Sequence, residues 1–251
     1  MKSATANQSG ALISTGINAN QFNAREISGL VLWINPSAEI GRSENDEVDS
    51  LLDFSSWDQV ITQGNSSERT TFHYNVEQSR SVIRSPGGSS KYLSIAYSPI
   101  IYMLPMTLIV RFLVNILPSV SLVSNGIFRI RHDVSPFYGL QLRVNNSDRF
   151  EVRVRDSASI AKTLADTTDI QPQTWYSFAM RISNTTIPIV NIFRDGVQVA
   201  STTVDQSSLF VHNGSSHLMR IDSSSYIDGD LSSFMIFNRA LSDHEIRMVS
   251  I

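Results

Sequence analysis

Five arginines occupy alternate positions in three short segments that switch regularly between apolar and polar side chains. They are Arg129, Arg131, Arg143, Arg153 and Arg155. Successive side chains of an extended strand point to opposite faces, so arginines in one phase share a face when such strands pair in sequence order. The planar guanidinium group suits carboxylate and sulfate groups, which accept two hydrogen bonds from it. We therefore predict a binding site for an acidic glycan or an acidic protein surface.

An ordinary solvated sheet face is the alternative explanation for these arginines. In that arrangement Asp133, Glu151 and Asp156 neutralise the guanidinium groups. A sugar site would also use exposed aromatic rings for stacking, and the aromatic residues near expected loops are Trp57, Tyr97, Tyr102, Tyr138 and Tyr226. Anchoring in the core is the commoner role for such side chains, so both interpretations stay open.

Other combinations of reactive side chains do not indicate catalysis. Glycoside hydrolysis needs two carboxylates roughly 5–9 Å apart on one face, and the acidic cluster to test is Glu44, Asp46, Glu47 and Asp49. Its residues lack alternating apolar partners, so we place the cluster in a solvated loop. His212 and His217 have no second pair of ligands, and the chain has no cysteine. We predict no enzymatic activity, no bound metal and no cofactor.

Strands must position the arginines, because apolar runs and turn signals recur about every dozen residues along the chain. The runs cover 27–34, 107–117, 140–145, 150–155, 175–182, 189–194 and 197–200. Asn146 to Arg149 supply a turn between two runs, and Asp195-Gly196 is a favoured hairpin turn whose two residues both accept positive φ. The predicted fold class is all-β, a sandwich of two antiparallel sheets.

The closing stretch 227–246 has the most specific local pattern in the chain. It predicts a buried strand, a tight reversal and a one-turn helix. Ser242 can cap the helix, while Glu245, three residues later, returns its carboxylate to the amide of the cap. Leu241 and Ile246 occupy the two positions of a hydrophobic staple. We therefore expect a short C-terminal helix fastened by its own sequence.

A change of composition near Ile27 predicts the domain organisation. Residues 1–26 are small and polar, with too little apolar surface to offset the entropy of ordering, so we predict a flexible N-terminal arm. Residues 27–251 form one predicted domain, because no repeat or low-complexity tract divides them. Within that domain, the polar segment 35–64 is expected to be mostly surface loop.

Six phrases of the chain carry a family resemblance. They are GLVLW (29–33), DFSS (53–56), KYLSI (91–95), MTLIVRF (106–112), WYSFA to RDGV (175–197) and DGDLSSFMIFNRALSDHEI (228–246). In this order they resemble laminin-G-like, concanavalin A-type jelly-roll domains, a family that mostly binds or builds. The resemblance implies a jelly-roll sandwich over residues 27–250. Trp57 and Phe112 depart from the family pattern, so its calcium sites and sugar pockets do not transfer automatically.

Overall charge limits the partners of the protein. The 251-residue chain has 20 Lys and Arg against 23 Asp and Glu, a formal net charge of −3. Such a chain has no global field that favours nucleic acid or an anionic membrane. The apolar segment 100–117 contains Pro105, Arg111 and Asn115, so we interpret it as strand rather than as a membrane span. We expect neither nucleic acid nor a membrane as partner.

Several absent features favour a biological setting. The N-terminus has no apolar signal-peptide core, and the lack of cysteine is compatible with assembly in a cytoplasm. With an arm and no catalytic groups, this favours a phage virion protein, such as a capsid decoration, head-fibre or tail protein. The arm would dock onto a capsid or tail protein of the same particle, and a homo-oligomer is compatible with this role. The expected localisation is the virion, assembled in the host cytoplasm. A lectin or adhesin that binds glycans at a cell surface is the alternative.

Overall fold

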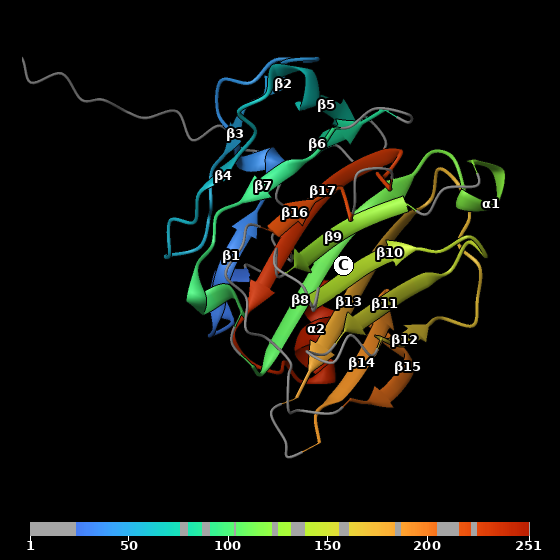
Figure 1. Ribbon diagram of the computed structural model, residues 1–251. Helices are drawn as coiled ribbons and strands as arrows, with labels where there is room; N and C mark the ends of the chain where they lie inside the picture. Colours follow the sequence, from blue (N-terminus) through green and yellow to red (C-terminus); the bar gives the residue numbers. More distant parts are fainter. Residues whose placement is uncertain are drawn as a thin grey trace, which may run out of the picture.

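Two antiparallel sheets pack face to face in the computed structural model (Figure 1). It describes residues 24–75, 80–86, 91–102, 104–121, 125–131, 139–155, 161–183, 187–204, 216–221 and 225–250. Every strand pair in these ranges is antiparallel. The predicted all-β sandwich is therefore confirmed.

Nine strands of the described chain form one sheet. Their order is β15 (Val197–Thr203), β14 (Ile189–Arg194), β13 (Trp175–Ile182), β8 (Met106–Val114), β17 (Gly229–Phe237), β6 (Arg80–Ser85), β5 (Thr70–Asn75) and β2 (Glu47–Val48), and β1 (Leu30–Ile34) also pairs with β17. The predicted β14–β15 hairpin is confirmed. Asp195 and Gly196 in its turn have φ values of 51° and 77°, the left-handed region that this turn requires.

Eight further strands of the described chain form the second sheet. Their order is β12 (Ala161–Ala165), β11 (Phe150–Arg155), β10 (Gly139–Val144), β9 (Asn125–Arg131), β16 (Ser216–Leu218), β7 (Leu93–Ile95), β4 (Ile61–Thr62) and β3 (Ser50–Leu51). Figure 1 shows β9, β10 and β11 side by side across β8 and β13 of the other sheet. The three arginine-bearing segments thus pair in sequence order, as the alternation predicts.

Large side chains between the sheets form the main core. Phe150 of β11 lies with its ring centroid 4.7 Å from that of Phe178 on β13 and 5.4 Å from that of Phe112 on β8. All three rings are completely buried. Burying such a side chain contributes about 1.5–3 kcal/mol, and aromatic pairs add to that. These rings therefore join the two layers near the middle of the sandwich.

A second apolar cluster covers part of the outer face of the nine-stranded sheet. It joins Ile109 of β8 to Leu241, which precedes the C-terminal helix α2 (Asp243–Val249), and to Ile246 within that helix. Because of this cover, both faces of β8 are buried at that point, whereas the sequence predicts one mixed face. The strand also ends at Val114, earlier than predicted, and Ile116 is 45% exposed.

Short helices and short strands connect the remaining parts. The 3-10 helices are η1 (Ala24–Glu26), η2 (Pro36–Ala38), η3 (Ser66–Glu68) and η4 (Pro99–Tyr102), and α1 spans Pro118–Ser121. Ala24 is buried in the second cluster, so η1 packs against the sandwich. The expected loop 35–64 instead contains η2, β2, β3 and β4. Strands of two residues show no alternation in sequence, and their pairing partners β5 and β7 are distant along the chain.

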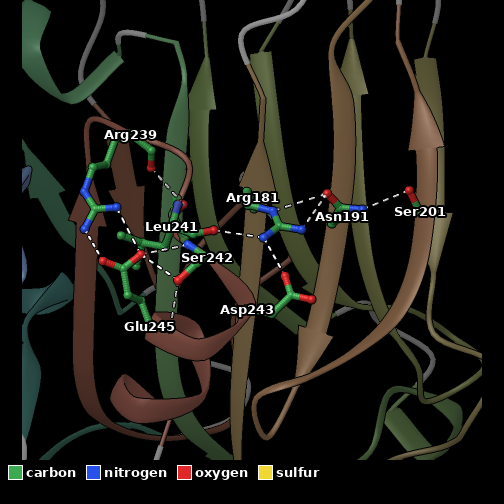
Figure 2. A network of polar contacts seen from close by, with 9 residues as sticks. Arg181, Asn191, Ser201, Arg239, Leu241, Ser242, Asp243 and Glu245 are labelled. Atoms are coloured by element: carbon green, nitrogen blue, oxygen red, sulfur yellow. Dashed lines mark hydrogen bonds and ion pairs between the residues drawn. The ribbon is translucent and has the colours of Figure 1, made fainter.

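The predicted capping box begins helix α2. Ser242 Oγ accepts from the Glu245 amide at 3.2 Å, and the Ser242 amide donates to Glu245 Oε2 at 2.8 Å. Glu245 also pairs with the guanidinium of Arg239 (Figure 2). Arg239 Nε donates in addition to the Ser28 carbonyl at 2.7 Å. The helix spans seven residues rather than one turn.

Arg181 of β13 fastens the start of α2 to the nine-stranded sheet. Its Nη1 donates to the Leu241 carbonyl at 2.8 Å and to Asp243 Oδ1 at 2.6 Å. Asn191 accepts from the same guanidinium at 3.3 Å and donates to Ser201 Oγ at 2.9 Å, which extends the network across β14 and β15 (Figure 2). The helix is thus held by charged hydrogen bonds on two sides.

Replacing Glu245 with alanine is expected to destabilise the protein by about 1–2 kcal/mol at pH 7, through loss of the cap and of the Arg239 pair. The side-chain hydrogen bond from Arg239 is the main cause that lowers the pKa of Glu245 from 4.5 to about 2. This stabilisation is therefore complete above about pH 4.5 and is lost as the pH falls towards 2.

Thermal unfolding of Glu245→Ala and of the unchanged protein at a series of pH values measures this. Glu47→Gln, which removes an exposed charge paired with Arg69 at 3.4 Å, is the control and should change stability little. A difference between Glu245→Ala and the unchanged protein that persists undiminished at pH 2 would contradict the assignment.

Candidate functional site

One row of polar side chains crosses the outer face of the eight-stranded sheet. Cross-strand register aligns Ser94 of β7, His217 of β16, Arg129 of β9, Gln141 of β10, Arg153 of β11 and Thr163 of β12. We call these six residues the polar strip. Five strand spacings of about 4.8 Å give it a length of roughly 24 Å. The strip lies opposite the apolar side chains that the same strands bury in the core.

A break in alternation after β16 brings another arginine to this face. Leu218 and Met219 are consecutive residues, yet both are completely buried in the core. Met219 has a φ of 68°, in the left-handed region that an unbranched apolar residue rarely adopts. The irregular backbone returns the next side chain, Arg220, to the outer face, where it contacts Tyr92. Bulges and left-handed residues that re-aim a side chain often occur beside functional sites.

Arg220 is stacked between two aromatic rings. The guanidinium carbon lies 4.4 Å from the ring centroid of Tyr92 and 5.5 Å from that of Tyr226. The ring of His217 is 4.9 Å from that of Tyr92, so the strip and the stack touch. We call Tyr92, Arg129, His217, Arg220 and Tyr226 the arginine–aromatic cluster. All of its members except Arg129 are partly exposed.

Arg129 supports this cluster from below. It is 6% exposed, and its guanidinium donates to the Ile221 carbonyl and, at 2.9 Å, to Nδ1 of His217. A guanidinium group can only donate, so His217 accepts at Nδ1 and its neutral ring has its proton on Nε2. Arg129 therefore fixes the orientation of the His217 ring.

Glu151 neutralises part of the arginine set at the other end. Its carboxylate accepts from Arg143 Nε at 2.7 Å and from Asn145 Nδ2 at 3.0 Å, and it lies 3.9 Å from Arg153 Nη2. The side chains of Glu151 and Arg143 are 7% and 16% exposed, whereas Arg153 is 33% exposed. Arg143 is therefore bound in a buried ion pair, while Arg153 presents more of its charge to solvent.

The predicted arginine face is thus assembled in part. Arg129, Arg143 and Arg153 share the outer face, while the side chains of Arg131 and Arg155 lie outside the described residues. Sequence reasoning missed Tyr92 and Arg220. Tyr92 precedes a short strand whose phase was readable, but the reversal of phase at Met219 leaves no signal in the sequence. Whether this face binds a ligand stays a prediction.

Ile221 and Ser225, which are next to the cluster in sequence, lie very close to the backbone of β9 at Gly126. A Cβ atom on Gly126 would lie 2.5 Å from the Ser225 carbonyl oxygen and 2.6 Å from the Ile221 amide nitrogen. Real Cβ contacts of this length do not occur, so a side chain at Gly126 would displace the segment that carries Arg220 and supports Arg129.

Gly126→Ala is therefore expected to destabilise the protein by about 1–3 kcal/mol, because the segment that carries Ile221 and Ser225 must move. The matched control is Gly64→Ala, since a Cβ there meets no atom within 4 Å, and its effect should stay within about 0.5 kcal/mol. Urea unfolding of both variants measures the difference. Equal stability of the two variants would show that the close approach does not constrain the fold.

The acidic cluster of the sequence is built into structural contacts. Glu44 accepts a hydrogen bond from the Tyr74 amide at 2.7 Å. This bond is the main cause that lowers the pKa of Glu44, and the hydrogen bond with Nδ1 of His73 lowers it further. Asp46 accepts from the Ser43 amide, and Asp49 pairs with Arg42. This segment lies at the β2 and β3 edges, and β4 alone separates β3 from β7, where the polar strip ends. The cluster is largely exposed, as predicted, but Glu47 belongs to strand β2 rather than to a loop.

The remaining predicted site residues have different positions. His217 belongs to strand β16 and is part of the arginine–aromatic cluster, whereas His212 lies outside the described residues. Of the predicted aromatic residues, Tyr226 joins the cluster, whereas Trp57 and Tyr97 are 50% and 47% exposed. The side chains of Tyr102 and Tyr138 lie outside the described residues.

Two features are absent from the described part of the chain. No three His, Asp or Glu side chains there come together as metal ligands, and no described helix has the length and apolar character to cross a membrane. The apolar segment 106–114 is the strand β8, as predicted.

Comparison with solved structures identifies similar folds. The chain is 13% identical to the binding domain of Paraclostridial Mosquitocidal Protein 1, with a TM-score of 0.65 over 88% of this chain and 51% of that one. A second similar structure is that of botulinum neurotoxin type C, whose cell entry is dependent upon interaction with two ganglioside molecules. The identity is 13% and the TM-score 0.65, over 88% of this chain and 50% of that one. Trypanosoma rangeli sialidase in complex with the inhibitor DANA is 12% identical, with a TM-score of 0.61 over 89% of this chain and 33% of that one. The chain thus spans about half the length of the toxin structures, and at these identities the likeness establishes the fold alone.

Comparison of sequences identifies the family. No curated protein sequence matches the chain. The family model of laminin G type, described as the concanavalin A-like lectin/glucanases superfamily, matches residues 119–247, just over half of the chain. As the order of its six phrases predicts, the chain belongs to the concanavalin A-like lectin/glucanases superfamily.

Proposed function

We propose that the protein is a non-enzymatic glycan-binding module whose arginine–aromatic cluster holds an acidic sugar. The observation that carries this proposal is the position of Arg220, whose guanidinium is stacked against Tyr92 and Tyr226 beside the ring of His217. Stacking orients a guanidinium group and reduces the entropy that it loses on binding a carboxylate. The cluster is therefore pre-organised for an anion.

Sugar recognition fits the rest of the outer face. Sugar rings offer both apolar faces and hydroxyl groups, so their sites combine aromatic rings with polar groups that fix orientation. Tyr92 and Tyr226 supply rings, while Ser94, His217 and Gln141 supply donors or acceptors along the strip. The strip is long enough, at roughly 24 Å, for several linked sugar units.

An acidic sugar is favoured over a neutral one by charge. Arg153 and Arg220 are partly exposed guanidinium groups on this face, and Arg129 lies beneath them. Glu151 pairs with Arg143 on this face and lies 3.9 Å from Arg153. Two structural neighbours are a botulinum neurotoxin whose cell entry depends upon interaction with two ganglioside molecules and a sialidase in complex with an inhibitor. This likeness adds weight to an acidic glycan without identifying it.

Arg220→Ala is expected to weaken the binding of acidic glycans by about tenfold or more, the effect of losing a charged hydrogen bond. Arg220→Lys should not restore binding, because an ammonium group lacks the planar, stacked fork. The control is Arg149→Ala, which removes an arginine on the β10–β11 turn that pairs with Asp169 at 2.8 Å. An array of matched acidic and neutral glycans measures all three variants.

Retention of acidic glycans by Arg220→Ala at the level of Arg149→Ala would exclude the cluster as the site. Preference for neutral glycans would leave a lectin but remove the role proposed for the guanidinium groups. Binding of no glycan by the unchanged protein would overturn the proposed function.

For the biological setting we propose a phage virion, with residues 1–26 docking onto a capsid or tail protein. This proposal rests on the sequence alone, since residues 1–23 lie outside the described residues. Deletion of residues 1–23 keeps η1, whose Ala24 is buried against the sandwich. Co-sedimentation with phage particles should be lost in this variant while glycan binding is kept. Unchanged co-sedimentation, or lost glycan binding, would contradict the docking role.

A further inference from the structure

Three large apolar side chains are exposed together at the β3 edge of the eight-stranded sheet. Ile40 is 95% exposed, Leu52 59% and Val60 57%. Leu51 pairs with Ile61 across β3 and β4, so Leu52 and Val60 stand at the next position of that register. Ile40 and Leu52 line one open cavity of about 440 Å³. We call Ile40, Leu52 and Val60 the apolar edge.

The apolar edge lies in the most acidic part of the chain. Residues 39–69 contain eight Asp and Glu against two arginines, a net charge of −6, whereas the whole chain has a net charge of −3. Glu39, Asp46 and Arg42 line the same cavity as Ile40 and Leu52, so the carboxylates there outnumber the one guanidinium group. A partner that covers the apolar edge therefore meets a surplus of negative charge around it.

The backbone around the apolar edge is held in place. Glu39 Oε1 accepts from the Leu52 amide at 2.7 Å, and Arg42 Nη2 donates to the Ser50 carbonyl at 2.7 Å. The Asn45 amide donates to the Phe72 carbonyl at 2.8 Å, which ties the same segment to β5. A pre-organised surface loses little entropy when a partner docks, which raises affinity.

We propose that the apolar edge docks a protein partner whose contact surface combines Lys or Arg with apolar side chains. Contiguous exposed apolar groups mark interaction sites, and the surrounding carboxylates select a cationic partner. An anionic lipid surface would be repelled by a net charge of −6. Addition of a strand is opposed because the side chains of Glu39 and Arg42 occupy the Leu52 amide and the Ser50 carbonyl at this edge. The partner therefore docks through side chains, and this proposal does not depend on glycan binding.

A short labelled peptide of alternating Lys and Leu is the probe, and a peptide with Glu in place of Lys is its matched counterpart. Fluorescence anisotropy should show saturable binding of the basic peptide that weakens with salt. Ile40→Ser and Leu52→Ser should each weaken it by about fivefold or more, as expected for anchor residues. The control Val120→Ser removes a 73% exposed apolar side chain on α1 and should bind as the unchanged protein does.

Equal binding of the acidic peptide would overturn the charge argument. Unchanged affinity in both Ile40→Ser and Leu52→Ser would overturn the location. Sedimentation velocity of the protein alone adds a third outcome. Self-association that disappears in Ile40→Ser but not in Val120→Ser would assign the apolar edge to a second copy and overturn the proposed partner. Because Ile40 is almost fully exposed, Ile40→Ser should keep the thermal stability of the unchanged protein.

Discussion

Burial of Phe150 between the two sheets fixes where every functional side chain of β11 points. Its ring packs against Phe112 and Phe178 of the opposite layer, so Val152 and Val154 also face inward. The intervening residues must then face outward, because side chains of a strand alternate. Register between β9, β10 and β11 carries the same constraint across the sheet and aligns Arg129 with Arg153 through Gln141. The polar strip is thus a consequence of core packing.

The two outer faces of the sandwich differ in their cover. Helix α2, capped by Ser242 and fastened by Arg181, covers apolar residues of the nine-stranded sheet. The outer face of the eight-stranded sheet presents partly exposed arginine and tyrosine side chains instead. The acidic β3 edge adds a third surface with a different charge.

Much of the fold could be predicted, because local sequence patterns specify many of its elements. Alternation predicted β10 and β11, the Asp195-Gly196 dipeptide predicted the hairpin, and Ser242 with Glu245 predicted the cap. The two-residue strands in 35–64 were missed, because each is too short to show alternation and because β2 and β4 pair with strands that are distant along the chain. The site was predicted only for residues in regular alternation. Arg220 was missed because its direction depends on the left-handed backbone at Met219, which tertiary packing imposes.

The central claim is that Arg220 and its neighbours on the polar strip contact an acidic glycan. Nuclear magnetic resonance of the arginine Nε–Hε groups during titration with an acidic oligosaccharide tests this most directly. The account predicts saturable shifts of Arg220 and Arg153 with one affinity, while Arg149 on the neighbouring turn stays unchanged. Shifts confined to arginines outside both the polar strip and the arginine–aromatic cluster, or an Arg220 resonance that does not move as glycan binds, would contradict it.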